Sequence, residues 1–268
     1  MEAPFGGTHE RVRAWRLIVD EACDGAWNMA VDAAMLAARS RGDAPPTLRL
    51  YRWRRPTVSL GKFQDVGDVD AETVRRLGAD VVRRPTGGRG VLHDDELTYS
   101  VVAGVEDGIP RGVVASYRLF SRALAGAYQA LGVAAEITAR PRGTRGAGAC
   151  YLHATHADLS LGAAKLSGSA QVWQSEACLQ HGSFVRSRDV ELESRIFKLD
   201  PEAQAQLAAS TMTLADALGT PPAIELIAEA VVASFERALG VTFEPGRLSE
   251  PELDEAERSA GSYGVRLG

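Results

Sequence analysis

Apolar residues recur along this chain at two spacings, and their alternation predicts both strands and helices. Short alternating or β-branched runs bounded by glycine or proline predict strands, whereas apolar positions three and four residues apart predict helices. The predicted strands are Trp15–Asp20, Thr47–Trp53, Thr57–Leu60, Asp80–Arg84, Leu97–Ala103, Ala157–Leu161, Lys165–Val172 and Ala177–Gln180. The predicted helices are Trp27–Ala38, Ala71–Leu77, Pro110–Leu131 and Pro222–Leu239, followed by a last helix that begins at a capping box of Ser249 and Glu252.

Strand patterns alternate with helical patterns up to about residue 187, and helical patterns follow. This order favours an α/β fold in which helices pack on a sheet. We therefore predict an α/β catalytic domain over residues 1–187 and a small helical extension over residues 188–268, packed on it. The chain has neither an internal repeat nor a tract of low complexity, so a repeat architecture is not expected.

Composition narrows the classes of protein that remain. The chain has 268 residues, 45% of them hydrophobic, and a formal net charge of -5. That content supports a large core, and the charge shows no footprint of nucleic-acid binding. No stretch approaches the roughly 20 apolar residues of a membrane span, the N-terminus lacks a secretory pattern, and no CxxC or HExxH motif supports a zinc site. Cys23, Cys150 and Cys178 are too sparse for a disulfide scaffold, which favours the reducing cytoplasm.

A glycine-rich turn, RRPTGGRGVLHD, follows the strand pattern that ends at Arg84. Adjacent Gly87 and Gly88 permit positive φ and a close approach to a ligand, and exposed N–H groups in such a turn bind anions or carbonyl oxygens. Arg84 or Arg89 could hold a phosphate or carboxylate. The sequence is neither a P-loop nor GxGxxG. It also fits a tight surface turn, in which His93 is a hydrogen-bonded structural residue.

Cys150 has the sequence context of a functional thiol. It follows the loop Arg140–Ala149, which is rich in arginine and glycine. Functional residues gather on loops of this kind, whereas the alternative for a single intracellular cysteine is an inert, buried side chain. We assign Cys23 and Cys178 to the inert class, since Cys178 lies within a predicted strand.

Lys165 stands in a run of small and apolar residues, AAKLSGSAQ, downstream of Cys150. Lysine is seldom buried without a partner, and a nearby ammonium favours the nucleophilic thiolate form of a cysteine. Small residues after Lys165 leave room for a substrate chain, and the segment QHGS follows them. The small residues are Gly168, Ser169 and Ala170, and the QHGS segment supplies His181 and Gly182.

Three stretches in this order resemble the biotin/lipoate protein ligase superfamily. They are RRPTGGRGVLHDDELTYS (83–100), AKLSGSAQ (164–171) and LQHGS (179–183). More narrowly, the chain looks like the octanoyltransferases of the Bacillus type that act in lipoyl synthesis, from about Trp15 to the C-terminal helices. The resemblance implies an α/β (α+β) fold with a mixed, largely antiparallel sheet flanked by helices.

The resemblance also implies roles for particular residues. The position of Cys150 forms an acyl-thioester intermediate, and that of Lys165 lowers the pKa of this thiol and touches the acyl carbonyl. No metal and no ATP are implied, because the donor thioester is already activated. The implied substrate-binding positions are Arg84, Thr86, Gly87, Gly88, Arg89, Gly90, Val91, His93, Gly168, Ser169, Ala170, His181 and Gly182.

The activity implied is transfer of an octanoyl group from octanoyl-acyl carrier protein to a lysine of a lipoyl domain, such as the glycine-cleavage H protein. An ATP-dependent lipoate–protein ligase is the first alternative, since it shares the glycine-rich turn and the KxxGSA pattern but needs no cysteine at position 150. A non-catalytic acyl- or carrier-binding protein on the same fold is the second. For a biotin ligase, Arg89-Gly90 is only a fragment of the expected adenylate loop.

Overall fold

The computed structural model of the protein describes residues 13–138 and 158–268. Its strands are β1 (Arg13–Cys23), β2 (Thr47–Trp53), β3 (Thr57–Leu60), β4 (Asp80–Arg83), β5 (Val91–His93), β6 (Glu96–Gly104), β7 (Glu136–Thr138), β8 (Asp158–Leu161), β9 (Ala164–Ser167), β10 (Ser169–Gln174), β11 (Ala177–Val185) and β12 (Val241–Pro245). Its helices are α1 (Gly25–Arg41), α2 (Ala71–Leu77), α3 (Val113–Ala130), α4 (Val190–Ile196), α5 (Pro201–Ser210), α6 (Leu214–Leu218), α7 (Ile224–Leu239) and α8 (Glu250–Tyr263). None of these helices is long and apolar enough to cross a membrane.

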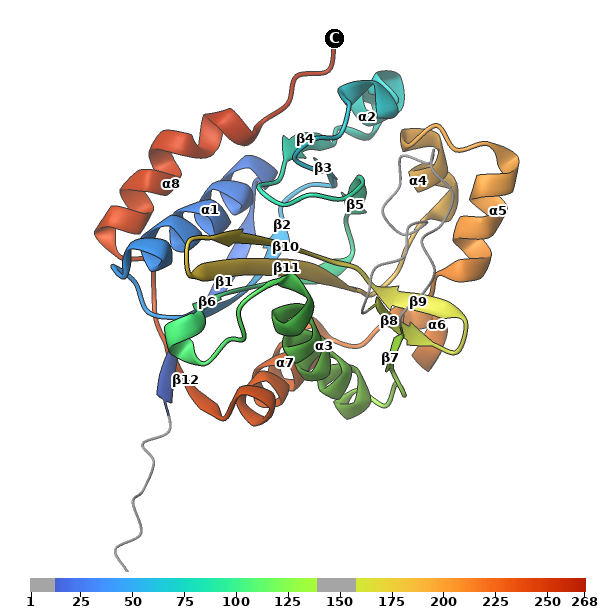
Figure 1. Ribbon diagram of the computed structural model, residues 1–268. Coiled ribbons are helices and arrows are strands. Elements are labelled where there is room, and N and C mark those ends of the chain that lie inside the picture. Colours follow the sequence, from blue (N-terminus) through green and yellow to red (C-terminus); the bar gives the residue numbers. More distant parts are fainter. Residues whose placement is uncertain (1–12, 139–157) are drawn as a thin grey trace, which may run out of the picture.

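A mixed sheet forms the centre of the protein (Figure 1). Its strand order is β10-β11-β6-β2-β1-β12, with β1 parallel to β2 and to β12 and the other neighbours antiparallel. Every residue of β6 is buried, as expected of a strand in the middle of a sheet that is covered on both faces. The expected mixed, largely antiparallel α/β architecture is therefore confirmed.

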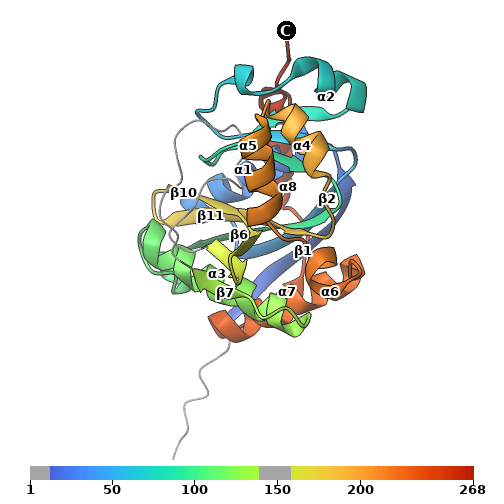
Figure 2. The same cartoon turned by 90° about the vertical axis from the view of Figure 1, so that its right-hand side faces the viewer.

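Helix pairs cover the two faces of this sheet (Figure 1, Figure 2). Helices α1 and α8 pack together on one face, and α3 and α7 on the other. Beneath α3 and α7, the ring of Tyr128 stacks on Phe184 at 4.7 Å, and Phe120 stacks on Phe235 at 6.4 Å. Because both faces are closed in this way, any charged side chain on the central strands must find its partner inside the protein.

Two smaller, three-stranded sheets carry the segments that the sequence marks as functional. The sheet β4-β3-β5 holds the glycine-rich turn, which connects β4 to β5. The sheet β7-β8-β9 holds Lys165 on β9, and the chain passes at Gly168 from β9 into β10 of the central sheet. The Lys165 strand therefore ends where the chain changes sheets, whereas the glycine-rich turn joins two strands of one small sheet.

Several elements differ from the sequence predictions, and β1 and β11 are also longer than the strands predicted there. The single strand predicted over Lys165–Val172 is two strands, because the chain changes sheets at Gly168. The helix predicted from Pro110 begins at Val113, since Gly112 precedes it with a φ of 93°, which is not helical. Strands β5, β7 and β12 were not predicted, because three to five residues carry too little periodicity. Strand β12 also lies in a segment that was predicted to be wholly helical.

The segment after residue 187 packs on the rest of the chain at several points. Strand β12 extends the central sheet beside β1, and Arg16 on β1 binds Glu252 on α8 through two contacts of 2.6 Å. Ser249 caps the N-terminus of helix α8, and its hydroxyl accepts from the backbone N–H of Glu252, so the predicted capping box is confirmed. The division into residues 1–187 and 188–268 stays a prediction.

Candidate active site

A pocket lies between the glycine-rich turn and the central sheet. Its empty space, counted together with the open solvent at its mouth, is about 460 Å³. Helix α1, strands β2, β3, β5, β6, β10 and β11, and the residue after β4 all contribute to its wall. The lining residues are Met29, Tyr51, Trp53, Ser59, Arg84, Val91, His93, Thr98, Gly168, Ser169, Ala170, His181, Gly182 and Ser183.

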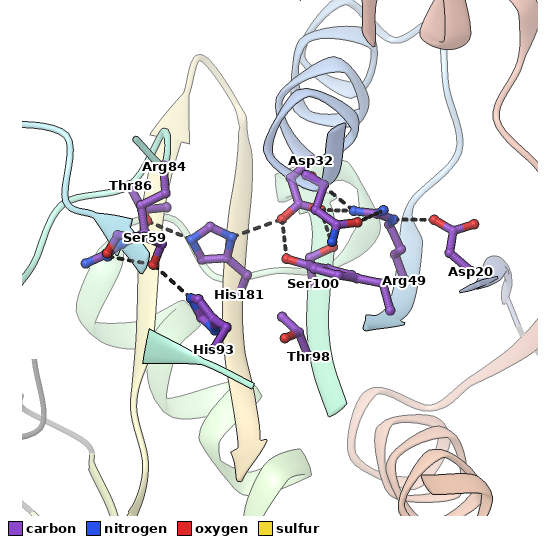
Figure 3. Close-up of polar contacts among 12 residues, drawn as sticks. Asp20, Asp32, Arg49, Ser59, Arg84, Thr86, His93, Thr98, Ser100 and His181 are labelled. Carbon is purple, nitrogen blue, oxygen red and sulfur yellow. Dashed lines mark hydrogen bonds and ion pairs between the residues drawn. The ribbon is translucent and has the colours of Figure 1, made fainter. Parts of the chain in front are cut away.

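His181 connects the glycine-rich turn to helix α1 (Figure 3). Its Nδ1 lies 3.0 Å from Asp32 Oδ2, and its Nε2 lies 2.7 Å from Thr86 Oγ1. Burial lowers the pKa of His181 despite the opposing pull of Asp32, so the ring is neutral. An ionised carboxylate only accepts hydrogen bonds, so Nδ1–H donates to Asp32 and Nε2 accepts from the Thr86 hydroxyl.

Asp32 is a fully buried carboxylate that several donors satisfy. Besides His181, it accepts from Arg49 Nη1 at 2.9 Å, Ser100 Oγ at 2.8 Å and the Tyr51 hydroxyl at 3.1 Å. Burial alone would raise the pKa of Asp32, but the hydrogen bond from His181 and the charge of Arg49 outweigh it and lower the pKa. The carboxylate is therefore ionised, and the positive charge of Arg49 on β2 compensates it between helix α1 and the sheet.

A second histidine–carboxylate pair lines the same pocket. His93 Nδ1 lies 2.8 Å from Glu96 Oε1, and His93 Nε2 lies 2.8 Å from Ser59 Oγ. The Ser59 oxygen also accepts from Arg84 Nη1 at 3.3 Å. Burial opposes ionisation of Glu96, but His93 and nearby hydroxyls lower the pKa of this carboxyl below its usual range. The His93 ring also stacks on Trp53 at 4.2 Å.

Arg84 is buried and holds the glycine-rich turn in shape. Its guanidinium donates to the carbonyl oxygens of Ser59 at 3.0 Å, Gly87 at 2.8 Å and Arg89 at 2.7 Å. Arg89 forms an ion pair with Asp68 at 3.4 Å. In this structure the guanidinium groups of Arg84 and Arg89 therefore bind other groups of the protein. The prediction that one of them binds a phosphate or carboxylate of a ligand stays a prediction.

A positive φ and a close backbone contact explain two glycines at the turn, Gly88 and Gly61. Gly88 has a φ of 98°, a conformation that residues with a Cβ rarely adopt. A Cβ placed on Gly61, at the end of β3, would lie 1.9 Å from the Gly88 carbonyl oxygen. The turn and β3 therefore touch through bare backbone, as the adjacent glycines in the sequence suggested.

Lys165 is buried beside an acidic partner on the neighbouring strand. Its side chain is 2% exposed, and its Nζ lies 3.2 Å from Asp158 Oδ1 on β8. The expectation that a buried lysine needs a partner is thus met. The carbonyl oxygen of Lys165 accepts from the backbone N–H of Met212, which attaches β9 to the segment before α6. The ammonium is held in one position on the strand that leads into the pocket wall at Gly168.

The structure brings together many of the predicted site residues, but not all of them. Arg84, Val91, His93, Gly168, Ser169, Ala170, His181 and Gly182 line the pocket. Thr86 reaches it through His181, whereas Gly87, Gly88, Arg89 and Gly90 belong to the turn and do not line it. Lys165 is not among the lining residues. Cys150 and the loop Arg140–Ala149 lie outside the described residues.

Sequence reasoning missed the carboxylates that orient the site. Asp32 lies in the buried face of α1, and Glu96 opens a strand that is buried throughout. A charged residue inside an otherwise apolar pattern was the available signal, because such a residue must be paired. Arg49, between Leu48 and Leu50, and Asp158 give the same signal. Across residues 13–138 and 158–268, no group of three or more histidine, cysteine, aspartate or glutamate residues could hold a metal ion.

Two solved structures of lipoate–protein ligases have this fold. A lipoate-protein ligase A bound with ATP superposes with a TM-score of 0.77 at 24% identity, covering 92% of this chain and 94% of that one. The bipartite lipoate protein ligase of Thermoplasma acidophilum, studied with its E2 lipoyl domain, gives 0.75 at 23% identity, covering 93% and 92%. At these identities the likeness shows the fold, which is that of the lipoate–protein ligases.

The model of the lipoyl protein ligase A/B catalytic domain matches residues 24–236, which include the pocket, the glycine-rich turn and Lys165. Octanoyltransferase LipM of Symbiobacterium thermophilum is 43% identical, covering 91% of this chain and 93% of the relative. Octanoyltransferase LipM of Kyrpidia tusciae is 38% identical, covering 94% and 97%. Within the lipoyl protein ligase A/B class, the chain therefore belongs to the octanoyltransferase LipM family.

Proposed function

We propose that this protein moves an octanoyl group from octanoyl-acyl carrier protein to a lysine of a lipoyl domain, through a thioester on Cys150. The observation that carries the proposal is membership in the octanoyltransferase LipM family over nearly the whole chain, 91% of it for one relative. The protein is accordingly an acyltransferase of protein lipoylation. A lipoyl domain of the glycine-cleavage H protein type is the proposed acceptor.

The reaction proceeds as two acyl transfers on one thiolate. The Cys150 thiolate attacks the donor thioester carbonyl, and the tetrahedral intermediate expels the carrier's phosphopantetheine thiolate, leaving octanoyl–Cys150. The neutral amine of the acceptor lysine then attacks this thioester. Collapse of the second intermediate restores the Cys150 thiolate and forms an amide, and the proton from nitrogen passes to the departed phosphopantetheine thiolate or to water. No phosphoryl transfer is needed, so the proposal includes no role for ATP.

Lys165 has two proposed tasks in these transfers. Its ammonium favours the thiolate form of Cys150 and opposes the negative charge that develops on the acyl carbonyl oxygen. Burial supports this assignment, because a charge in a low-dielectric site acts more strongly on its neighbours than one in water. The ion pair with Asp158 fixes where the ammonium lies.

The pocket is the proposed site of the octanoyl chain. Met29, Trp53, Val91 and Ala170 give it apolar surface, and each methylene buried there would contribute about 0.8 kcal/mol to binding. A Cβ on Gly182 would lie 2.6 Å from the Gly168 carbonyl oxygen, so the glycine lets β10 and β11 approach at the pocket wall. A largely apolar pocket suits an unbranched acyl chain.

Recognition of the two protein substrates is proposed to involve exposed arginines. Arg52, Arg54 and Arg55 are exposed at the end of β2 and just beyond it, and Arg54 pairs with Asp24 at 3.0 Å. Cationic side chains of this kind favour an acidic carrier protein. The proposed location of the reaction is the cytoplasm, which the sparse cysteines favour.

Steady-state transfer of octanoate to a purified lipoyl domain tests the proposal. The expected result is transfer from octanoyl-acyl carrier protein without ATP, with parallel double-reciprocal lines that indicate a ping-pong mechanism. Lys165→Met is expected to lower kcat/KM by at least about 100-fold, whereas the matched Lys198→Met on an exposed lysine leaves it unchanged. Transfer that requires ATP and free octanoate would instead assign the protein to the ligases.

A further inference from the structure

An exposed phenylalanine follows strand β3. Phe63 is 88% exposed, which makes it the most exposed large apolar side chain of residues 13–138 and 158–268. A single exposed apolar residue is common on protein surfaces, so its surroundings decide whether it marks a binding surface. Three features of those surroundings do so: a fixed backbone, a place beside the active site, and a neighbouring cation.

The backbone that carries Phe63 is held by hydrogen bonds on both sides of the ring. Arg83 Nη1 donates to the carbonyl oxygens of Gly61 at 2.9 Å and Gln64 at 2.8 Å. The backbone N–H of Gln64 donates to the Gly61 carbonyl oxygen at 3.0 Å, which closes the turn. Because the residues before and after Phe63 are fixed in this way, little conformational freedom is lost when a partner covers the ring.

The same segment is attached to the glycine-rich turn of the candidate active site. The backbone N–H of Lys62 donates to the Thr86 carbonyl oxygen at 2.9 Å. Ser59, four residues before Phe63, lines the pocket. The Cα atoms of Ser59 and Phe63 are no more than about 14 Å apart, since an extended chain spans at most about 3.6 Å per residue. A domain of about 100 residues has a radius of gyration near 13 Å, so a domain seated on Phe63 lies next to the pocket.

A cation accompanies the aromatic ring. Lys62 is exposed, and its Nζ lies 5.7 Å from the centroid of the Phe63 ring. Asp65 and Asp68, which follow in the sequence, accept hydrogen bonds from within the same segment. The protein as a whole has a formal net charge of -5, so an exposed ring with a lysine beside it is a local surface that favours an acidic partner.

We propose that Phe63 and Lys62 anchor the acyl donor, an acidic carrier domain that presents its acyl group on a phosphopantetheine arm. The inference rests on the proposed function, since it names the surface that binds the donor of that reaction. The arm suits this surface, because its phosphate is an anion for Lys62 and its length lets the domain dock beside the pocket. The acceptor lysine reaches only as far as a four-carbon side chain allows, so the acceptor domain has to sit closer to the reacting thiol.

The test measures, by calorimetry, the Kd of a carrier protein whose octanoyl group is joined by an amide, so that it binds but cannot transfer. Phe63→Ala is expected to weaken binding by about 10-fold or more, as for an aromatic residue at the centre of an interface, and Phe63→Tyr, which keeps the ring, by less than about threefold. Lys62→Glu is expected to weaken binding at low ionic strength and less so at high salt. Leu226→Ala is the matched control, because this side chain is 55% exposed on α7, at the end of the protein away from β3 (Figure 1, Figure 2).

A comparison of substrates separates docking of the donor from the reaction itself. Octanoyl pantetheine lacks the carrier domain, so its rate of acyl-enzyme formation is expected to be the same in Phe63→Ala and the wild type. With octanoyl-acyl carrier protein, KM is expected to rise in Phe63→Ala while kcat stays nearly unchanged, because uniform binding is lost. The Kd of a lipoyl domain is expected to stay unchanged. The exposed position of Phe63 means that the variant folds as the wild type does, which thermal unfolding checks.

Equal Kd values of the carrier protein for Phe63→Ala and the wild type would overturn the inference, as would no binding of the carrier protein to the wild type. A loss of lipoyl-domain binding as large as the loss of carrier binding would also overturn it, because Phe63 would then not be particular to the donor. If the carrier binds with the expected dependence on Phe63 but no octanoyl group is transferred, the proposed function fails and the inference about the docking surface stands.

Discussion

Lys165 and Asp158 form an ion pair between neighbouring strands, with Nζ 3.2 Å from Oδ1 and both side chains buried. Removing one member of such a pair leaves a buried charge without compensation, which costs far more than removing both. We expect Asp158→Asn to lower the free energy of unfolding by about 3 kcal/mol in denaturant titration. Adding Lys165→Met to that variant is expected to restore part of the loss. Strictly additive losses from the two substitutions would contradict a coupled pair.

Burial of His181 makes stability depend on pH in the mildly acidic range. Its folded pKa lies below the ordinary value of 6.5, because burial disfavours the charged ring even beside Asp32. As pH falls through about 6.5, the unfolded chain takes up a proton that the folded protein resists, so stability present at neutral pH is lost on acidification. This group contributes a slope of at most about 1.4 kcal/mol per pH unit. Denaturant titrations across this range should show a shallower slope for His181→Gln, and an unchanged slope would refute the assignment.

The close contact between Gly61 and Gly88 predicts that even one methyl group is not tolerated. Gly61→Ala would place a Cβ against the Gly88 carbonyl oxygen, so the turn must move. We expect a loss of about 1–3 kcal/mol in unfolding free energy and reduced octanoyl transfer, since the turn supplies Thr86 and Arg84. Gly261→Ala is the control, because it meets nothing within 4 Å in helix α8. It is expected to stabilise the protein by about 0.5–1 kcal/mol. Equal effects of the two substitutions would contradict the contact.

The capping box at the start of α8 gives a further prediction. Ser249→Ala removes the hydroxyl that accepts from the Glu252 N–H and is expected to lower the unfolding free energy by about 1 kcal/mol. The matched Ser259→Ala removes a hydroxyl that bonds within the same helix to the Glu255 carbonyl oxygen, and should change stability by less than about 0.5 kcal/mol. Thermal unfolding of both variants measures the difference. Similar losses at the two positions would show that the cap contributes nothing particular.

Elements whose limits are set by local sequence were predicted from the sequence alone. Thr47–Trp53, Thr57–Leu60 and Ala71–Leu77 have the bounds that their patterns indicate. In the last of these, Gly78 ends the helix with a φ of 68°, as a glycine at that place should. Elements that depend on distant partners were not predicted. Strand β12 forms by pairing with β1, more than 200 residues away in the sequence, and its own residues carry no strand pattern that predicts it.

The candidate site divides in the same way. Gly168, His181 and the glycine-rich turn stand in short, distinctive segments, and the fold brings them to one pocket. Asp32 and Glu96 were missed because a carboxylate within an apolar pattern reveals its partner only when helix α1 and strands β6 and β11 are packed. The position of Lys165 was predicted, but its partner Asp158 depends on the pairing of β8 with β9, which periodicity does not specify.

The cysteine-based transfer is tested most directly by intact-protein mass spectrometry after incubation with octanoyl-acyl carrier protein in the absence of ATP. We predict one octanoyl adduct on the wild type and on Cys23→Ala, none on Cys150→Ala, and loss of the adduct when a lipoyl domain is added. Cys178 should not be modified, since burial raises the pKa of its thiol to about 12. An adduct that persists in Cys150→Ala, or no adduct on the wild type while ATP and free octanoate support transfer, would contradict the thioester on Cys150.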